Sequence, residues 1–148
     1  MSMLRFDDRV AVITGAGTGI GAAYAQQLSS RGANVVVNDL DLGAADQTVA
    51  NILKVGGRAV AVASDVSTED GAAAVIDAAI SQFGRVDIVV NNAGMLRSAP
   101  FADLSVDLLD RIIAVNLRGT FLITHAVWPL EGSVAVAKLP TLSHQLWG

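Results

Sequence analysis

Residues 10–39 hold the feature that most limits what this chain can fold into, a glycine-rich turn between a short strand and a helix. An apolar run of strand length, 10–14, leads into the turn, which reads Gly-Ala-Gly-Thr-Gly-Ile-Gly over 15–21. Residues 22–28 then have a helical pattern, and a second apolar run ends in the acid Asp39. Strand, turn, helix, strand and acid in this order predict a parallel βαβ unit with a nucleotide-sized gap at the carboxyl ends of its strands.

The residue types of this unit suit a dinucleotide. Glycines permit a sharp turn and leave no Cβ between the main chain and a pyrophosphate, and the positive end of the following helix attracts an anion. Asp39 lies where a carboxylate can accept hydrogen bonds from an adenine ribose. The same carboxylate would repel a 2′-phosphate, and Ala16, Thr18 and Leu40 offer no cation to receive one. The sequence therefore predicts NAD, with NADP disfavoured. Glycine clusters also form plain turns and a strand-end Asp also caps helices, but the order of elements favours the nucleotide.

The composition excludes several classes of function. The 148 residues carry a net charge of −4, contain no cysteine and have no basic run, which argues against a nucleic-acid partner and against disulfide or cysteine–metal chemistry. We expect no metal site. No uncharged apolar run approaches the roughly 20 residues that span a bilayer, and residues 1–8 lack the apolar core of a signal peptide. We therefore expect a cytoplasmic protein with no membrane partner.

The rest of the chain repeats the alternation of strand and helix. The expected elements are a helix at 42–53, a strand at 58–63, a helix stripe at 72–83, a strand at 86–90 and a long helix from Ser105. Ser67 and Asp70 have the spacing of a capping box, which predicts Ser67 as an N-cap. Connections of helix length require parallel strands with right-handed crossovers. The fold class is α/β, a doubly wound parallel sheet of the Rossmann type.

Polar residues follow two further strands at the edge where ligands of open α/β sheets bind. Asp65 could accept a hydrogen bond from an adenine amino group. Asn91 and Asn92 could hold the turn over 91–94, with Ala93 and Gly94 as a low wall beside a cofactor, although such residues also simply make turns. Asn116 is a polar group on an apolar helix face, so it is either a structural tie to neighbouring backbone or part of a site.

These motifs together resemble the short-chain dehydrogenase/reductase family. The matching stretches are Thr14-Gly15-x-x-x-Gly19-x-Gly21, Asp39, Asp65-Val66, Asn91-Asn92-Ala93-Gly94 and Asn116-Leu117-Arg118-Gly119, and the similarity runs from about residue 5 to about residue 128. More narrowly, residues 4–7, 14–17, 35–39 and 117–119 are similar to the dehydrogenase domain of peroxisomal multifunctional 3-hydroxyacyl-CoA enzymes and their bacterial relatives. A methyltransferase that binds S-adenosylmethionine also uses a glycine turn and a strand-end acid, but residues 91–94 and 116 disfavour it.

The resemblance implies hydride transfer between NAD and an alcohol or ketone, for example a 3-hydroxyacyl-CoA. The implied cofactor-binding residues are Gly15, Thr18, Gly19, Ile20, Gly21, Asp39, Asp65, Val66, Asn92, Ala93 and Gly94. Gly15, Gly19 and Gly21 would carry the phosphates, with Ile20 against the cofactor. Asp39 would take the adenosine ribose, and Asp65 and Val66 the adenine. Residues 92–94 would line the nicotinamide side, and Asn116 would be the first member of the family's Asn-Ser-Tyr-Lys catalytic set.

The chain departs from the family pattern after Pro129. Residues 1–130 are expected to form the dinucleotide-binding domain, and 131–148 a divergent tail. The family's Tyr-x-x-x-Lys is absent, because the only tyrosine is Tyr24 and Leu28 stands four residues later. Ser133 and Lys138 are interpreted as a turn residue and a solvated charge. We therefore expect an incomplete sheet that lacks its last strands, in a C-terminally truncated chain without turnover: a non-catalytic NAD-binding fragment or an unstable gene product.

The tail and the long helix carry two further expectations. Residues 133–137 have strand character and could lie beside the fourth strand as a surrogate fifth. The helix from Ser105 would lack the partner that covers its flank, and its exposed apolar surface would favour a homo-oligomer or aggregation.

Overall fold

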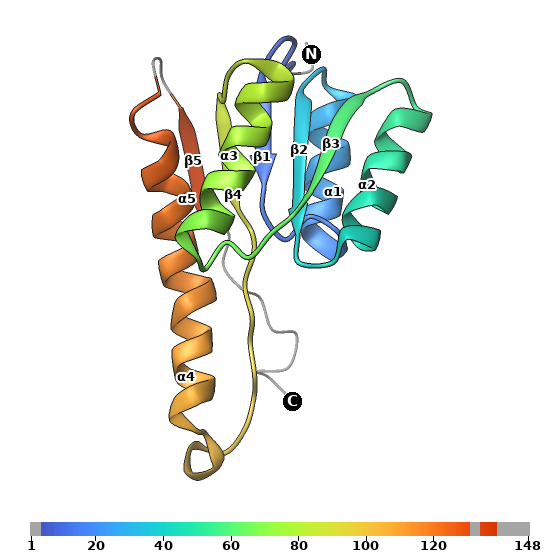
Figure 1. Cartoon of the computed structure of the whole chain (residues 1–148). Helices are drawn as coiled ribbons and strands as arrows, with labels where there is room; N and C mark the ends of the chain where they lie inside the picture. The colour runs from blue at the N-terminus through green and yellow to red at the C-terminus, as the bar shows by residue number, and fades with distance from the viewer. Residues whose placement is uncertain (1–3, 131–133, 139–148) are drawn as a thin grey trace.

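The computed structural model describes residues 4–130 and 134–138, which form one parallel sheet flanked by helices (Figure 1). The strand order is β3-β2-β1-β4-β5, and every neighbouring pair is parallel. The strands are β1 (Val10–Ile13), β2 (Asn34–Asp39), β3 (Arg58–Ala63), β4 (Ile88–Asn91) and β5 (Ala135–Lys138). The doubly wound α/β fold predicted from the sequence is confirmed.

Helices cover both faces of the sheet, and the side chains on both sides of its central strands are therefore buried. The α-helices are α1 (Gly19–Ser30), α2 (Leu42–Lys54), α3 (Glu69–Phe83), α4 (Val106–Ile113) and α5 (Gly119–Val127). In β1, Ala11 and Ile13 pack with buried residues of α1 and α2, whereas Val10 and Val12 pack with those of α3 and α5. This alternation explains why β1 is apolar throughout rather than at every second residue.

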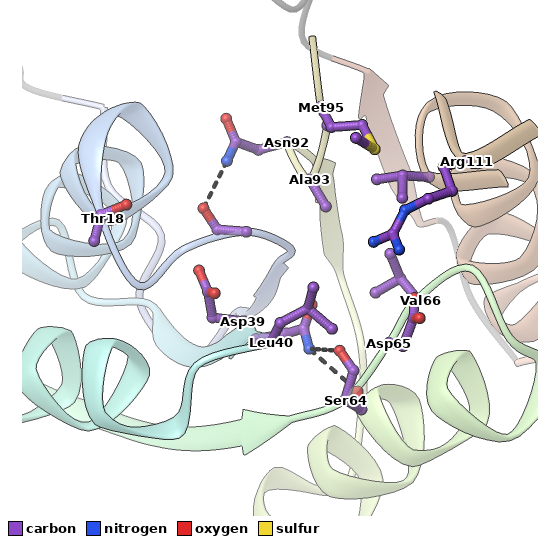
Figure 2. Close-up of a pocket in the computed structure, with 14 residues that line it drawn as sticks. Thr18, Asp39, Leu40, Ser64, Asp65, Val66, Asn92, Ala93, Met95 and Arg111 are labelled. Carbon is purple, nitrogen blue, oxygen red and sulfur yellow. Dashed lines mark hydrogen bonds between the residues drawn. The ribbon is translucent and has the colours of Figure 1, made fainter. Parts of the chain in front are cut away.

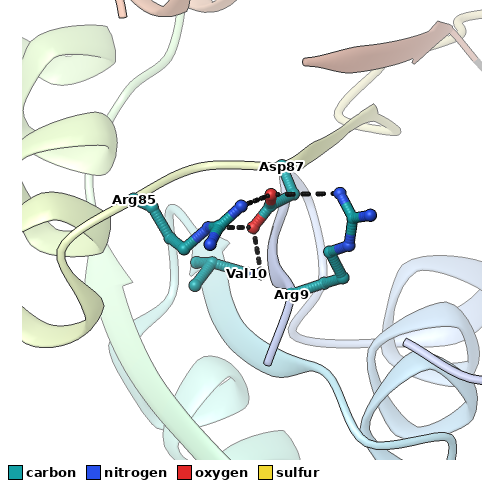
Figure 3. Close-up of polar contacts among 4 residues, drawn as sticks. All are labelled: Arg9, Val10, Arg85 and Asp87. Atoms are coloured by element: carbon teal, nitrogen blue, oxygen red, sulfur yellow. Dashed lines mark hydrogen bonds and ion pairs between the residues drawn. The ribbon is translucent and has the colours of Figure 1, made fainter. Parts of the chain in front are cut away.

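One end of the sheet is held by Asp87, which directly precedes β4 (Figure 3). Its carboxylate is 4% exposed and accepts hydrogen bonds from the backbone N–H of Val10 at 2.8 Å and from Nε of Arg85 at 2.9 Å. Arg9 adds an ion pair at 3.3 Å. The Asp87 carbonyl also accepts from the N–H of Ala135. Asp87 therefore joins the amino ends of three adjacent strands, β1, β4 and β5.

The N-cap of α3 differs from the expected one. Thr68 caps the helix, with Oγ1 accepting from the Gly71 N–H at 3.0 Å, so the prediction that Ser67 caps it was wrong. Ser67 instead donates its hydroxyl and its N–H to the Asp65 carboxylate. Both residues are small hydroxyl side chains, and the partner that Ser67 finds in Asp65 shifts the helix start by one residue.

The helix expected from Ser105 has an interruption. Ser105 is the N-cap as predicted, because its hydroxyl accepts from the Leu108 N–H at 3.2 Å. A π-helical turn over Ala114–Arg118 then separates α4 from α5. Figure 1 shows α4 extending past the carboxyl end of the sheet, beside the chain segment that follows β4. This extension carries exposed apolar side chains, among them Val106 and Leu109.

The strand beside β4 lies where a surrogate fifth strand was expected. Ala135 to Lys138 pair with Ile88 to Asn91 in parallel register. Ser133 lies outside the described residues. Lys138 is exposed, yet its Nζ donates to the Ala93 carbonyl at 3.2 Å, so it is not only a solvated charge. Partial desolvation of its ammonium group lowers the pKa of Lys138. The division of the chain into a domain of residues 1–130 and a tail remains a prediction.

Candidate functional site

A cleft of about 370 Å³ opens at the carboxyl ends of β1, β2, β3 and β4 (Figure 2). β1 lies between β2 and β4, so this is the point where the order of strands along the chain reverses, and such switch points bind ligands in open α/β sheets. The lining residues are Gly15, Thr18, Asn38, Asp39, Leu40, Ser64, Asp65, Val66, Asn92, Ala93, Gly94, Met95, Arg111 and Val115.

The amino end of α1 opens onto this cleft. Thr18 is the N-cap residue of α1 and also lines the cleft. Its side chain makes no capping hydrogen bond, and the first turn of α1 has no acidic residue. Gly15 and Gly19 adopt φ values of +60° and +58°, which residues with a Cβ rarely do, so the glycines set the turn that aims this helix end. The helix dipole and the first-turn N–H groups favour an anion here.

The Asp39 carboxylate connects the end of β2 to the glycine turn. Oδ2 accepts from the Gly17 N–H at 2.9 Å, and Oδ1 accepts from the Asp41 N–H at 3.2 Å. A Cβ on Gly17 would stand 2.8 Å from Oδ2, so only glycine permits this approach. Asp39 is half-buried and lines the cleft, which leaves its carboxylate able to accept hydrogen bonds from a ligand as well.

Thr14 and Asn92 join the glycine turn to the end of β4. The Asn92 Nδ2 donates to the carbonyls of Thr14 at 3.1 Å and Gly15 at 2.8 Å. In return, the Thr14 hydroxyl accepts from the N–H groups of Asn92 and Ala93. These four hydrogen bonds hold Asn92 and Ala93 against the cleft, and the Asn92 side chain bonds the glycine turn rather than the turn over 91–94.

Gly21 does not line the cleft, although the sequence grouped it with the phosphate-binding glycines. It is buried, and a Cβ there would stand 2.3 Å from the Gly15 carbonyl and 2.5 Å from Nδ2 of Asn92. The missing Cβ of Gly21 therefore allows α1 to pack closely on the glycine turn.

Asp65 and Val66 form the wall after β3. Hydrogen bonds from the Ser67 side chain and backbone hold the pKa of Asp65 below its ordinary value, against the effect of burial, and the positive charge of Arg111 lowers this pKa further. Asn38 supports the same wall from β2, because its Nδ2 donates to the Val62 and Ser64 carbonyls. The carboxylate of Asp65 is therefore charged at neutral pH.

Three further predicted site residues do not line the cleft. Gly19 lies in the first turn of α1 with no atom within 4 Å of where its Cβ would be. Ile20 is exposed and lines a separate hollow with Phe6 and Tyr24. Asn116 lies in the π-helical turn, where Oδ1 accepts from the Met95 N–H and Nδ2 donates to the Met95 carbonyl, both at 2.9 Å. Asn116 thus ties down the backbone of Met95, one of the two roles that the sequence left open.

Sequence reasoning missed several lining residues, chiefly Ser64, Met95, Arg111 and Val115. Ser64 and Met95 directly adjoin predicted positions at strand ends and could have been included on that ground. Arg111 and Val115 are four residues apart, which places them on one helix face just before Asn116, and this spacing was a signal that could have found them. Arg111 is also a cation in the cleft, where the residues considered from the sequence offered none.

Comparison with known proteins identifies the family. The family model described as short chain dehydrogenase matches residues 9–135. This chain belongs to the short-chain dehydrogenase family, a family of oxidoreductases, as its motifs indicated.

Individual relatives agree with this assignment. The chain is 50% identical over 124 residues to the peroxisomal hydratase-dehydrogenase-epimerase of Neurospora crassa, covering 84% of this chain and 13% of that protein. It is 47% identical to a putative short-chain type dehydrogenase/reductase of Mycobacterium tuberculosis, covering 82% of this chain and 46% of that one. A solved 7α-hydroxysteroid dehydrogenase, in complex with NADH and 7-oxo glycochenodeoxycholic acid, matches with a TM-score of 0.87 at 37% identity, covering 91% of this chain and 54% of that chain. The chain thus spans about half, or less, of these relatives' length.

No helix within residues 4–130 and 134–138 combines the length and apolar character that crossing a bilayer requires. In the same part of the chain, no three His, Asp or Glu side chains gather where they could hold a metal ion.

Proposed function

We propose that this chain binds NAD in the cleft at the carboxyl edge of the sheet, as the nucleotide-binding part of an enzyme that transfers hydride between NAD and an alcohol or ketone. The observation that carries this proposal is the junction of Asp39 with the glycine turn, at the open amino end of α1. A carboxylate for ribose hydroxyls and a helix end for a diphosphate are thereby held side by side. The motif resemblance favours a 3-hydroxyacyl-CoA as the substrate.

The residues of the cleft fit such a cofactor. Gly15 and Thr18 bring main chain and the dipole of α1 to the diphosphate, with no acidic side chain in the first turn to repel it. Asp39 receives the adenosine ribose and disfavours a 2′-phosphate by charge repulsion. The volume of about 370 Å³ falls within the range of about 300–1,000 Å³ that is usual for small-molecule sites.

We assign residues 92–94 to the part of the cleft that receives the nicotinamide. Thr14 holds Asn92 and Ala93 by hydrogen bonds, and Asn116 bonds the backbone of Met95, so hydrogen bonds within the protein position this wall. When bound, NAD accepts or donates the hydride; the residues named here orient it. Asn116 is assigned as the surviving member of the family's catalytic set, and in this chain it acts through the backbone that it positions.

For the isolated 148-residue chain we propose cofactor binding without turnover. Its only tyrosine, Tyr24, lies in α1 and lines a hollow separate from the cleft. Without a positioned acid, loss of general acid–base catalysis slows hydride transfer by roughly 10²–10⁴-fold. The alternative is a fragment too unstable to bind at all. A cytoplasmic location and self-association also remain predictions, and the Neurospora relative is peroxisomal by name.

Calorimetric titration of the purified chain with NAD and NADP tests the proposal. We expect NAD to bind more tightly than NADP, and Asp39→Ala to weaken NAD binding by about tenfold or more, since hydrogen bonds to charged groups contribute about 1.5–3 kcal/mol. Asp46→Ala, an exposed carboxylate of α2, is the matched control and should leave the affinity unchanged. Tighter binding of NADP, or no binding of either nucleotide by folded protein, would overturn the proposal.

Turnover assays test the second part separately. With 3-hydroxyacyl-CoA or simple secondary alcohols and NAD, the rate of NADH formation should stay at background. Robust turnover would show that another group, or a second chain, supplies the missing acid.

A further inference from the structure

Arg111 is the basic residue that α4 contributes to the cleft. Figure 2 shows its guanidinium pointing from the helix toward Val66 and the centre of the cleft, on the side opposite Thr18. Within residues 4–130 and 134–138, no hydrogen bond or ion pair of its side chain is found. By contrast, Arg118, further along the same helical surface, pairs with Glu69 at 3.8 Å. Arg111 is thus an exposed cation at the cleft wall, without a hydrogen-bond or ion-pair partner among the described residues.

The surroundings of Arg111 indicate what kind of group it can receive. Leu40 and Val66 supply apolar surface to the cleft near the Asp65 carboxylate. The oxygens of Asp65 are engaged by Ser67, so Arg111 meets this carboxylate only as a more distant charge. The amino end of α1, which favours an anion, is on the opposite side of the cleft with Thr18. If a diphosphate lies at the amino end of α1, the side of the cleft at Arg111 is left for the ring at the other end of the nucleotide.

Resting on the proposed NAD site, we propose that Arg111 is a further cofactor-binding residue, whose guanidinium stacks on the adenine ring between α4 and the Leu40–Val66 surface. A guanidinium is planar and weakly hydrated and can stack face to face on an aromatic ring, whereas a lysine ammonium can place only a point charge over that ring. This contact gives the site affinity for adenine that does not depend on a hydrogen bond from the adenine amino group to the Asp65 carboxylate. In this arrangement α4 forms part of the binding site, through Arg111.

The test compares Arg111→Met and Arg111→Lys with the unchanged chain, by calorimetric titration with NAD and with AMP. Methionine keeps an apolar side chain but removes the positive charge and the planar group, whereas lysine keeps only the positive charge. We expect Arg111→Met to weaken the binding of NAD and of AMP by a similar factor of about ten, within the range measured for cation–π contacts. Arg111→Lys should weaken both by a smaller factor, because the ammonium keeps the charge but loses the planar stacking. Arg118→Met is the matched control, and urea unfolding of each variant checks that the fold is kept.

The outcomes separate the competing explanations. If Arg111→Lys binds NAD as tightly as the unchanged chain, charge alone is responsible and stacking is wrong. If NAD weakens but AMP does not, the contact lies outside the adenine. If Arg111→Met leaves both affinities unchanged while Asp39→Ala reduces them, this inference fails and the proposed NAD site stands. If the unchanged chain binds neither nucleotide, both fail.

Discussion

The carboxylate of Asp39 accepts a hydrogen bond from the backbone N–H of Gly17 at 2.9 Å, across a separation of 22 residues in the chain. The acid at the end of β2 and the turn before α1 therefore form one structural unit. A substitution at Asp39 consequently affects both the shape of the turn and any ligand that its carboxylate contacts.

Asp39→Asn separates these two effects. The amide oxygen can still accept from Gly17, so the turn should keep its shape, while the negative charge that repels a 2′-phosphate is lost. We expect the preference for NAD over NADP to fall by about five- to tenfold, since charged hydrogen bonds are roughly twice as strong as neutral ones. The measurement is the ratio of the two dissociation constants. An unchanged ratio would remove Asp39 from the determinants of cofactor choice.

Gly21→Ala should destabilise the protein by about 1–3 kcal/mol, the usual cost of overpacking a well-packed site. The new Cβ would stand 2.3 Å from the Gly15 carbonyl, a backbone atom that cannot move freely. Urea unfolding measures the change. Gly43→Ala in α2 is the control, because its Cβ would approach only the side-chain Oδ1 of Asp41, at 3.2 Å, and its stability should change little.

Asn116→Ala should release the backbone at Met95. Two hydrogen bonds of 2.9 Å are lost, which leaves a part-buried N–H and carbonyl unpaired at a cost of about 1–3 kcal/mol. Hydrogen exchange at the Met95 amide should become faster, with little change in the amides of β3. Asn51→Ala, which removes one exposed hydrogen bond to Gln47, is the control. Unaltered exchange at Met95 would mean that other contacts hold this segment.

Acid should weaken the fold through Asp87. Burial raises the pKa of Asp87, but hydrogen bonds from Arg85 and Val10 and the charges of Arg85 and Arg9 outweigh it and hold this pKa below the ordinary value. A carboxyl whose pKa is depressed by folding stabilises the protein above its unfolded pKa of about 3.9, and this contribution is lost as the pH falls through the folded-state pKa.

The measurement is the free energy of unfolding of the unchanged chain and of Asp87→Asn at pH 6 and near pH 3. The variant should be less stable by about 2 kcal/mol at pH 6, and the difference should shrink at the lower pH. Asp77→Asn, an exposed carboxylate of α3, serves as the control. A difference that stays constant with pH would contradict the assignment to Asp87.

The exposed face of the α4–α5 helices should drive self-association. Leu117 and Phe121 are 67% and 61% exposed and line an apolar hollow with Trp128. Contiguous apolar surface of this kind favours association. Replacing Leu117 and Phe121 together with Gln should lower the average mass in sedimentation velocity at high protein concentration. Leu53→Gln, at an exposed position of α2, should not change it. A monomeric unchanged chain would refute the prediction.

The sequence by itself determined the βαβ unit of residues 10–39, the alternation of strands and helices, and the positions of Asp39 at the end of β2 and of Asp65 just after β3. These follow from local signals, because apolar periodicity, turn glycines and element length act over a few neighbouring residues. The same signals do not say which side chain wins when two neighbours compete, as Ser67 and Thr68 do at the start of α3.

Only the tertiary structure decided how distant segments meet. In the structure Gly21 packs against the glycine turn and does not line the cleft. Asn116 bonds the backbone of Met95, and Arg111 lies at the cleft wall beside Val66. Gly21 and Asn92, Asn116 and Met95, and Arg111 and Val66 are pairs of residues far apart in the chain, so their proximity depends on the strand order and on how the helices pack across the sheet. Those are properties of the whole fold, and no short stretch of sequence contains them.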